Sequence, residues 1–375
     1  MSPQITTLGT IGSDPYHSMR SRLKTSGVYR PEDNAVMQNY RYQIDCYDES
    51  PYEIEVHNGF FLSTQVSIDL IGLSIKLYGL HFSSDGRFLY ISYKSIEGTK
   101  SLLSFVYLQL TVPWYFTINE SDSILTFTGF QSEITNVTNP NILPGGITSS
   151  LDGLDFYTGE NIPTTSPKQA LIRHYSIITG RENFVWNFQG SNYSNVETSN
   201  LVNRTNLIRG IKIHPDGTKL FVMKGDYNFT NSSGTVVNGV PGILQYTLSS
   251  PWSITSMTYN GQLSLTSYDT DPTDMEFSSD GRILYFTGLT TKRVYQVTLN
   301  TPWDVVNGIN SGVASKYFYR GYYTGHDSEP RGFYFNPDGL SFYILGSKYL
   351  TPPLLPDDSA STSTGSITRY GLIIS

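Results

Sequence analysis

The chain has 375 residues and a formal net charge of −7, and charged residues make up 15% of it, well below the ~25% of an average soluble domain. The acidic balance argues against a nucleic-acid partner, because phosphate backbones are bound by clustered lysine and arginine. The single cysteine, Cys46, excludes an internal disulfide framework and a cysteine-rich metal site, and we expect a buried free thiol. No apolar run approaches membrane-spanning length, so we expect no membrane insertion.

Residues 1–58 differ in character from the rest of the chain. They begin with neither a basic segment nor an apolar stretch, so we predict no secretory signal and expect synthesis in a host cytoplasm. Arginine, lysine and six tyrosines are scattered through them without an apolar period. We predict an extended arm that docks on a partner, since tyrosine offers contact area at low entropic cost. A disordered leader is the alternative.

Residues 59–375 carry a short signature five times. Each copy has an Asp-Gly dipeptide, with tyrosine or phenylalanine five positions after the aspartate, and successive aspartates lie 67, 64, 64 and 58 residues apart. The five aspartates are Asp85, Asp152, Asp216, Asp280 and Asp338. Repeats of this size, with alternating apolar residues on both sides of a hairpin turn, are typical of propeller blades.

Each repeat also predicts strands at fixed offsets from its aspartate. A first strand precedes the turn, and the residue six positions before the aspartate is glycine except at Asp274; the glycines are Gly79, Gly146, Gly210 and Gly332. A third strand follows in every repeat. The predicted third strands are Val106–Leu110, Ile172–Ile177, Ile243–Leu248, Val294–Leu299 and Ile367–Leu372.

Three repeats end in Leu-x-x-Pro-Trp, which contributes Trp114, Trp252 and Trp303. Proline presets a turn there, and we predict that the tryptophan covers the end of the blade. The second repeat lacks this motif, with Trp186 as a loose counterpart, and the fifth stops after its third strand.

We therefore predict an all-β fold, a β-propeller of five four-stranded blades. An N-terminal strand within Phe60–Leu70 would complete the last blade by pairing with its third strand, which removes an exposed sheet edge. A sixth blade within residues 1–58 is disfavoured, because that segment has no Asp-Gly turn.

Catalytic motifs are absent from the sequence, and its six histidines show no metal-binding spacing. Asp274 with Asp269, Asp271 and Glu276 could hold a cation, but the sequence favours a turn at Asp271 with solvated neighbours. Arg209 and Arg331 are candidates to face the channel, one position before the glycines. We predict no catalytic residue, no bound metal and no cofactor.

The connections between second and third strands, and between blades, are long and dissimilar. Gly225–Gly242 and Gly346–Ser366 far exceed the ~4–6 residues of an ordinary connection, and such loops commonly carry function. Propeller geometry puts them together on one side, which we call the variable-loop face. Binding is predicted there, with candidates Tyr227, Asn228, Tyr349, Asp357 and Asp358.

The fourth repeat carries a family resemblance. Its segments are Phe277-Ser278-Ser279-Asp280-Gly281, Leu284-Tyr285 and Pro302-Trp303-Asp304. They resemble the Phe-Ser-x-Asp-Gly-x-x-Leu-Tyr … Pro-Trp-Asp propeller repeats of marine bacteria and bacteriophages, and the likeness covers residues 70–375. The resemblance implies a β-propeller in a phage-related or surface-associated setting, and it carries over no catalytic residue.

Together these features predict a bacteriophage virion protein of the tail, tail fibre or attachment apparatus, present in multiple copies per particle. Its arm would bind other virion proteins, and its variable-loop face would bind a host surface glycan or protein. Two alternatives remain open: a lactonase-type propeller hydrolase with calcium bound in the channel, and a cellular interaction scaffold.

Overall fold

The structure is a computed structural model of the whole chain. It describes residues 66–67, 74–97, 100–110, 113–114, 125–126, 130–131, 143–162, 169–177, 186–187, 207–225, 229–230, 236–237, 239–307, 316–319, 330–337, 341–349 and 363–371. The predicted N-terminal arm, residues 1–58, and Cys46 lie outside this range. Among the described residues, no helix is long and apolar enough to cross a membrane.

The described residues form an all-β, propeller-like fold of five antiparallel sheets, which we number in chain order of their first strands. Sheet 1 contains β2 (Ser74–Phe82), β3 (Phe88–Glu97), β4 (Lys100–Leu110), β5 (Leu125–Thr126) and β6 (Phe130–Gln131). Sheet 2 contains β7 (Leu143–Ser149), β8 (Asp155–Ile162), β9 (Gln169–Ile177) and β10 (Trp186–Asn187). Sheet 3 contains β11 (Ile208–Ile213), β12 (Lys219–Lys224), β15 (Gly242–Leu248) and β16 (Met257–Ser264).

Sheet 4 contains β17 (Pro272–Phe277), β18 (Ile283–Gly288), β19 (Arg293–Thr298) and β20 (Lys316–Tyr319). Sheet 5 contains β21 (Gly332–Phe335), β22 (Ser341–Tyr349), β23 (Ser363–Gly371) and β1 (Val66–Ser67). Outside these sheets, β13 (Phe229–Thr230) pairs with β14 (Val236–Val237), and Ile254–Ser256 forms the short 3₁₀ helix η1. The predicted third strands overlap β4, β9, β15, β19 and β23, and the last two end one residue earlier than predicted.

The first strands of the five sheets contact one another in cyclic order: β2 with β7, β7 with β11, β11 with β17, β17 with β21, and β21 with β2. Glycine permits this close approach. A Cβ on Gly146 would lie 2.6 Å from Ile211 N, and one on Gly332 would lie 3.0 Å from Leu80 N. In sheets 1, 2, 3 and 5, the glycine six positions before the turn aspartate therefore lets the first strand lie close to a neighbouring first strand.

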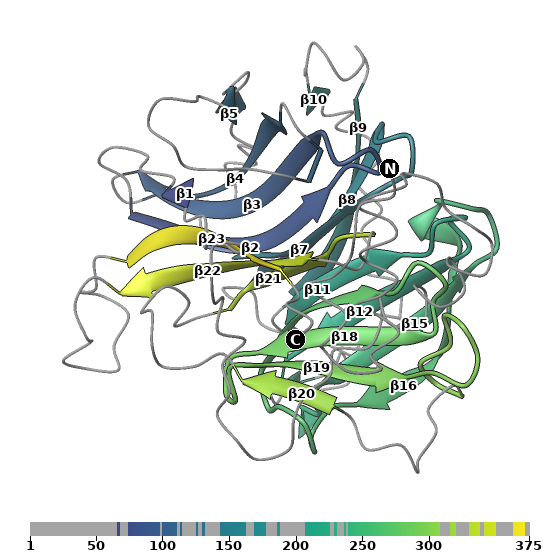
Figure 1. Cartoon of the computed structure of the whole chain (residues 1–375). Helices are drawn as coiled ribbons and strands as arrows, with labels where there is room; N and C mark the ends of the chain where they lie inside the picture. Colours follow the sequence, from purple (N-terminus) through teal and green to yellow (C-terminus); the bar gives the residue numbers. More distant parts are fainter. Residues whose placement is uncertain are drawn as a thin grey trace, which may run out of the picture.

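The last sheet takes in a strand from the N-terminal side of the chain. β1 pairs with β23 through Val66 with Ile367 and Ser67 with Ser366. In Figure 1 the yellow strands β22 and β23 accordingly lie beside the blue strands β1 and β2. This pairing confirms the prediction that a strand within Phe60–Leu70 completes the last sheet.

Three of the Asp-Gly turns, those of sheets 1, 2 and 4, share one local scheme, seen clearly in sheet 4. Ser278 Oγ donates to Asp280 Oδ1 at 2.6 Å, and the backbone N–H of Arg282 donates to the same carboxylate at 3.0 Å. Gly281 has a φ of +69°, a conformation that glycine adopts without penalty. The same serine–aspartate pair recurs at Ser83 with Asp85 and Ser150 with Asp152.

The tryptophans of the Pro-Trp motif pack on the turn glycine of their own sheet. A Cβ on Gly281 would lie 1.9 Å from the Trp303 ring, and Trp303 N donates to Gly281 O at 2.9 Å. Trp252 covers Gly217 and Trp114 covers Gly86 in the same way. The predicted packing of the three tryptophans is confirmed.

These tryptophans also connect neighbouring sheets. The Tyr157 hydroxyl of sheet 2 donates to Trp252 O of sheet 3 at 2.7 Å, and the Tyr343 hydroxyl of sheet 5 donates to Trp114 O of sheet 1. Phe221 holds the tyrosine position in sheet 3 and has no hydroxyl. Lys219 instead donates to the Trp303 carbonyl at 2.9 Å, so the sheet 3–sheet 4 link is kept by another residue.

Candidate functional site

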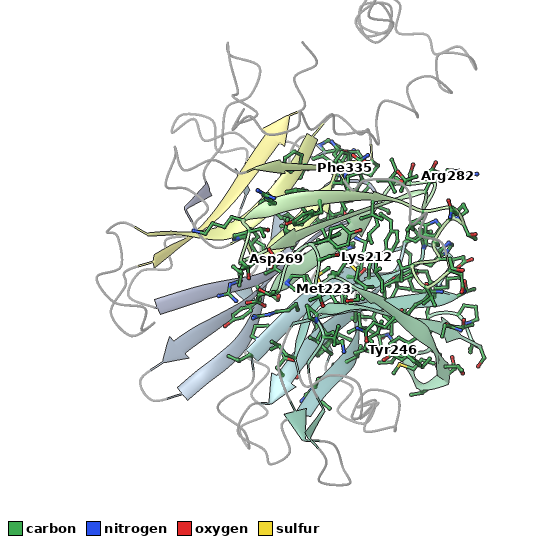
Figure 2. The ribbon with its side chains drawn as sticks, turned by 90° about the horizontal axis from the view of Figure 1, so that it is seen from below. Lys212, Met223, Tyr246, Asp269, Arg282 and Phe335 are labelled. Carbon is green, nitrogen blue, oxygen red and sulfur yellow. The ribbon has the colours of Figure 1, made fainter. Side chains whose placement is uncertain are left out.

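Five side chains occupy one repeat position on the first strands, and four of them, those of His81, Lys212, Glu276 and Tyr334, make contacts between sheets. The position lies four residues before the turn aspartate, and each side chain is buried, with at most 9% of its surface exposed. These residues, which we call the axial ring, are His81, Thr148, Lys212, Glu276 and Tyr334. Figure 2 places Lys212 in the interior, far from Arg282 at the margin.

Lys212 connects three sheets. Its Nζ forms an ion pair with Glu276 Oε2 on β17, and it lies 5.3 Å from the ring centroid of Tyr334 on β21. Sheets 3 and 5 are not neighbours in the cyclic order, so this contact spans the middle of the ring. Burial raises the pKa of Glu276 and the Lys212 charge opposes that shift. A pair of buried charges is tolerated because each neutralises the other.

His81 lies in the same centre and is neutral. Its Nε2 is 2.9 Å from Ser149 Oγ, which itself donates to Ser150 O at 3.0 Å. A hydroxyl has one proton to donate, so His81 Nε2 carries the hydrogen of the first bond. Burial lowers the pKa of His81 well below its usual value, and the Lys212 charge adds to the effect. Tyr334 meets the imidazole edge-on, at 5.9 Å between ring centroids.

Asp274 replaces the glycine of the other repeats and reaches the neighbouring strand. Its Oδ2 accepts from Phe333 N on β21 at 2.9 Å, and its Oδ1 accepts from Met275 N at 2.9 Å. Burial raises the pKa of this carboxyl well above its usual value, and the two backbone bonds oppose the shift. Asp274 thus links sheet 4 to sheet 5 at a place where the other sheets meet through glycine.

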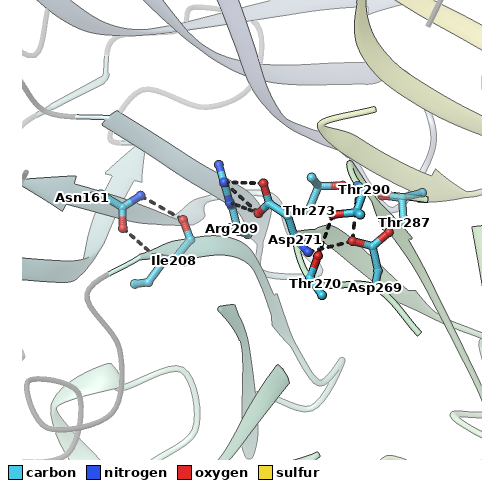
Figure 3. A network of polar contacts seen from close by, with 9 residues as sticks. All are labelled: Asn161, Ile208, Arg209, Asp269, Thr270, Asp271, Thr273, Thr287 and Thr290. Atoms are coloured by element: carbon cyan, nitrogen blue, oxygen red, sulfur yellow. Dashed lines mark hydrogen bonds and ion pairs between the residues drawn. The ribbon is translucent and has the colours of Figure 1, made fainter. Parts of the chain in front are cut away.

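A second polar network crosses sheets 2, 3 and 4 near the start of their first strands (Figure 3). Asn161 accepts from Ile208 N at 2.6 Å and donates to Ile208 O at 2.9 Å. The Arg209 guanidinium donates two hydrogen bonds to the Asp271 carboxylate, at 3.0 and 2.9 Å. Burial raises the pKa of Asp271 and Arg209 opposes that shift. Asp269 Oδ1 accepts from Asp271 N at 2.7 Å, which extends the network.

The acidic residues that the sequence grouped as a possible cation site are therefore separated by their partners. Asp269 binds backbone and threonine donors, Asp271 binds Arg209, and Glu276 binds Lys212. No group of three or more His, Cys, Asp or Glu side chains within the described residues could hold a metal ion. The favoured interpretation as a solvated turn was also wrong for Asp269 and Asp274, which are 2% and 4% exposed. Both are buried structural acceptors.

Sequence reasoning missed the axial ring, because it treated the histidines as scattered and looked six and seven positions before each aspartate. The sequence signal that could have revealed it is a shared position: His81, Lys212 and Glu276 each lie four residues before the aspartate of their own turn. The two arginines predicted to face the channel both have partners: Arg209 is paired with Asp271, and Arg331 Cζ lies 5.7 Å from the Tyr78 ring centroid.

Of the five predicted binding residues, one lies within the described part of the chain. Tyr349 is the last residue of β22. The other four candidates, Tyr227, Asn228, Asp357 and Asp358, lie outside the described residues. Binding through this face stays a prediction.

Comparison with known proteins gives distant structural likenesses alone. No protein-family model and no curated protein matches the chain. Among solved structures, the chain is similar to one in a nidogen/laminin complex, with 13% identity over 72% of both chains and a TM-score of 0.36. It is also similar to a putative 6-phosphogluconolactonase from Bacteroides uniformis, with 11% identity over 72% of this chain and 79% of that one, at a TM-score of 0.36. Similarity at this level transfers no function.

Proposed function

We propose that the chain is a non-catalytic binding protein built on a closed five-bladed β-propeller, and that it serves as a bacteriophage virion component in the tail, tail fibre or attachment apparatus. The proposal that the protein is non-catalytic rests on one observation: buried polar side chains at the centre of the ring are bonded to one another or to the backbone. Lys212 is paired with Glu276, His81 is bonded to Ser149, and Asp274 is bonded to the backbone of sheet 5. Catalytic groups must reach a substrate, whereas these groups hold the sheets to one another.

The closed ring is supported by two features of the described strands. The first strands contact each other in an unbroken cycle, and β1 joins β23 so that sheet 5 is completed from the other end of the chain. Closure by an N-terminal strand removes the unpaired edge that β23 would otherwise present. A rigid ring of this kind presents loops on its faces without changing its own shape.

The binding surfaces follow from this scaffold. We assign recognition of a host glycan or protein to the variable-loop face and attachment to other virion proteins to residues 1–58. The virion setting is supported by the resemblance of the Asp-Gly … Pro-Trp repeats to those of bacteriophage proteins. Several copies per particle would let weak contacts with a host surface add up.

Mass spectrometry of purified phage particles tests the setting directly. We expect peptides of this chain at several copies per particle, retained after washing in high salt. Particles that lack the chain, or a purified protein that hydrolyses lactones in a calcium-dependent reaction abolished by Glu276→Gln, would contradict the proposal. Lys219→Met provides a matched control for a hydrolysis assay, since Lys219 bonds the Trp303 carbonyl rather than the axial ring.

A further inference from the structure

The boundary between sheets 5 and 1 differs from the other four in how the chain connects the two sheets. Each of sheets 1 to 4 leads along the chain to the next, whereas sheet 5 is joined to sheet 1 through the two-residue strand β1, which pairs with β23. Aromatic packing supports the boundary: the Phe82 ring lies 4.8 Å from Tyr334 and 4.6 Å from Tyr343, between centroids. His81 adds its edge-on contact with Tyr334. Closure of the ring therefore depends on contacts in which His81 takes part.

One ring nitrogen of His81, Nδ1, has no hydrogen-bonding partner among the described residues. Because Nε2–H donates to Ser149, this buried Nδ1 carries a lone pair. The titratable groups that face the imidazole are Tyr90 of β3, Tyr334 of β21 and Lys212 of β11. The carboxylates of β17, Glu276 and Asp274, interact with Lys212.

Protonation at Nδ1 would put a second positive charge beside Lys212. Glu276 already neutralises Lys212 through their ion pair, so it offers the new charge little compensation. The new N–H would also meet no acceptor among the described side chains, and a buried donor without a partner is costly. A cationic His81 is therefore accommodated only if the imidazole moves away from Lys212 and Tyr334.

We propose that His81 is an acid-sensitive latch of the ring, whose protonation at Nδ1 separates sheet 1 from sheet 5 and releases the pairing of β1 with β23. The latch rests on the closed ring proposed above but is independent of the virion setting. Movement of His81 disturbs its contact with Tyr334, which packs on Phe82 across the boundary between sheets 5 and 1. β1 lies at the other edge of sheet 5 from β21, but it precedes β2 in the chain, so a sheet 1 that moves away from sheet 5 pulls β1 from β23. The remaining boundaries keep their covalent connections, so opening is confined to one place.

Hydrogen exchange of the full chain at pH 7.5 and pH 5.0 tests the latch, after correction for the intrinsic pH dependence of exchange. In the wild type we expect the amides of β1 and β23 to lose protection by up to about tenfold for each pH unit below the range where free histidine titrates, while β18 stays protected. His81→Phe keeps a ring at this place but cannot be protonated, and its exchange should be independent of pH. His174→Gln is the matched control: this histidine is half-buried beside Asp155 on sheet 2, and its removal should leave the acid response intact.

Several outcomes would overturn the latch. Equal protection of β1 and β23 at both pH values in the wild type would do so, and so would an unchanged acid response in His81→Phe. If His81→Phe does not fold, His81→Gln replaces it in the exchange experiment. A nitrogen NMR titration of the wild-type imidazole provides a second test, and a His81 that titrates like free histidine would refute the proposal. Exchange that is already fast at pH 7.5 would contradict ring closure itself, whatever is found in phage particles.

Discussion

At the scale of single residues, the tryptophan–glycine contact gives the repeat its sharpest steric requirement. Gly281 and Gly153 have nearly the same φ, +69° and +66°, but Trp303 lies on Gly281 whereas the second repeat has no Pro-Trp motif. We expect Gly281→Ala to lower the free energy of unfolding by about 3 kcal/mol, from overpacking and backbone strain together. Gly153→Ala should cost about 1 kcal/mol, from strain alone. Urea unfolding measures both, and equal losses would show that the ring contact contributes nothing.

The buried ion pair provides a second test at this scale. Lys212→Met leaves Glu276 buried without its counter-charge, which should cost about 3–5 kcal/mol, whereas Lys212→Met with Glu276→Leu should cost less than the single change. In the single variant the pKa of Glu276 rises further above its unfolded value, so the folded state binds the extra proton. Stability should therefore increase as the pH falls from 8 to about 6.5, above the range in which protonation of His81 opposes it. Thermal unfolding across this range checks the sign. A variant that is most stable at pH 8 would show that Glu276 is solvated.

At the scale of elements, the turns and third strands were predictable because their signals are local. Asp280-Gly281 sets a hairpin by backbone preference, and Val294–Leu299 shows an apolar alternation that the observed β19 nearly reproduces. The axial ring was harder to predict, because Lys212 and Tyr334 come from sheets that do not adjoin and meet only when the ring forms. Asp274 was misjudged for a related reason: its partner, Phe333 N, is 59 residues away.

The strand β1 carries the prediction that belongs to this scale. Deleting residues 1–70 removes β1 and leaves β23 as an unpaired edge, so we expect aggregation and a lower unfolding temperature. Deleting residues 1–58 keeps β1 and is the matched control, which should stay soluble. Light scattering and thermal unfolding distinguish the two. A soluble 1–70 deletion as stable as the control would mean that the Val66–Ser67 pairing with Ile367 and Ser366 is dispensable.

At the scale of the whole molecule, the proposed function divides assembly from recognition. The ring is stiffened from inside by contacts between sheets, such as Tyr157 with Trp252 and Arg209 with Asp271. Loops on such a scaffold can differ without disturbing the sheets, and an arm that orders on docking makes its contacts at an entropic cost. The two activities should therefore be separable by changing different segments of one chain.

Removing residues 1–45 should leave thermal unfolding unchanged and abolish incorporation into phage particles, because the arm is the proposed attachment element. The ends of the predicted Gly346–Ser366 loop are paired residues of β22 and β23, so the replacement is confined to residues 226–241 and 350–362. Unrelated sequences there should preserve incorporation and reduce adsorption to host cells. Particle mass spectrometry and adsorption rates measure the two effects. Arg282→Ser, a change of an exposed side chain in the Asp-Gly turn of sheet 4 and away from the variable-loop face, serves as control. If the truncated protein still enters particles, or the loop replacements leave adsorption untouched, then recognition and assembly are not divided between these segments.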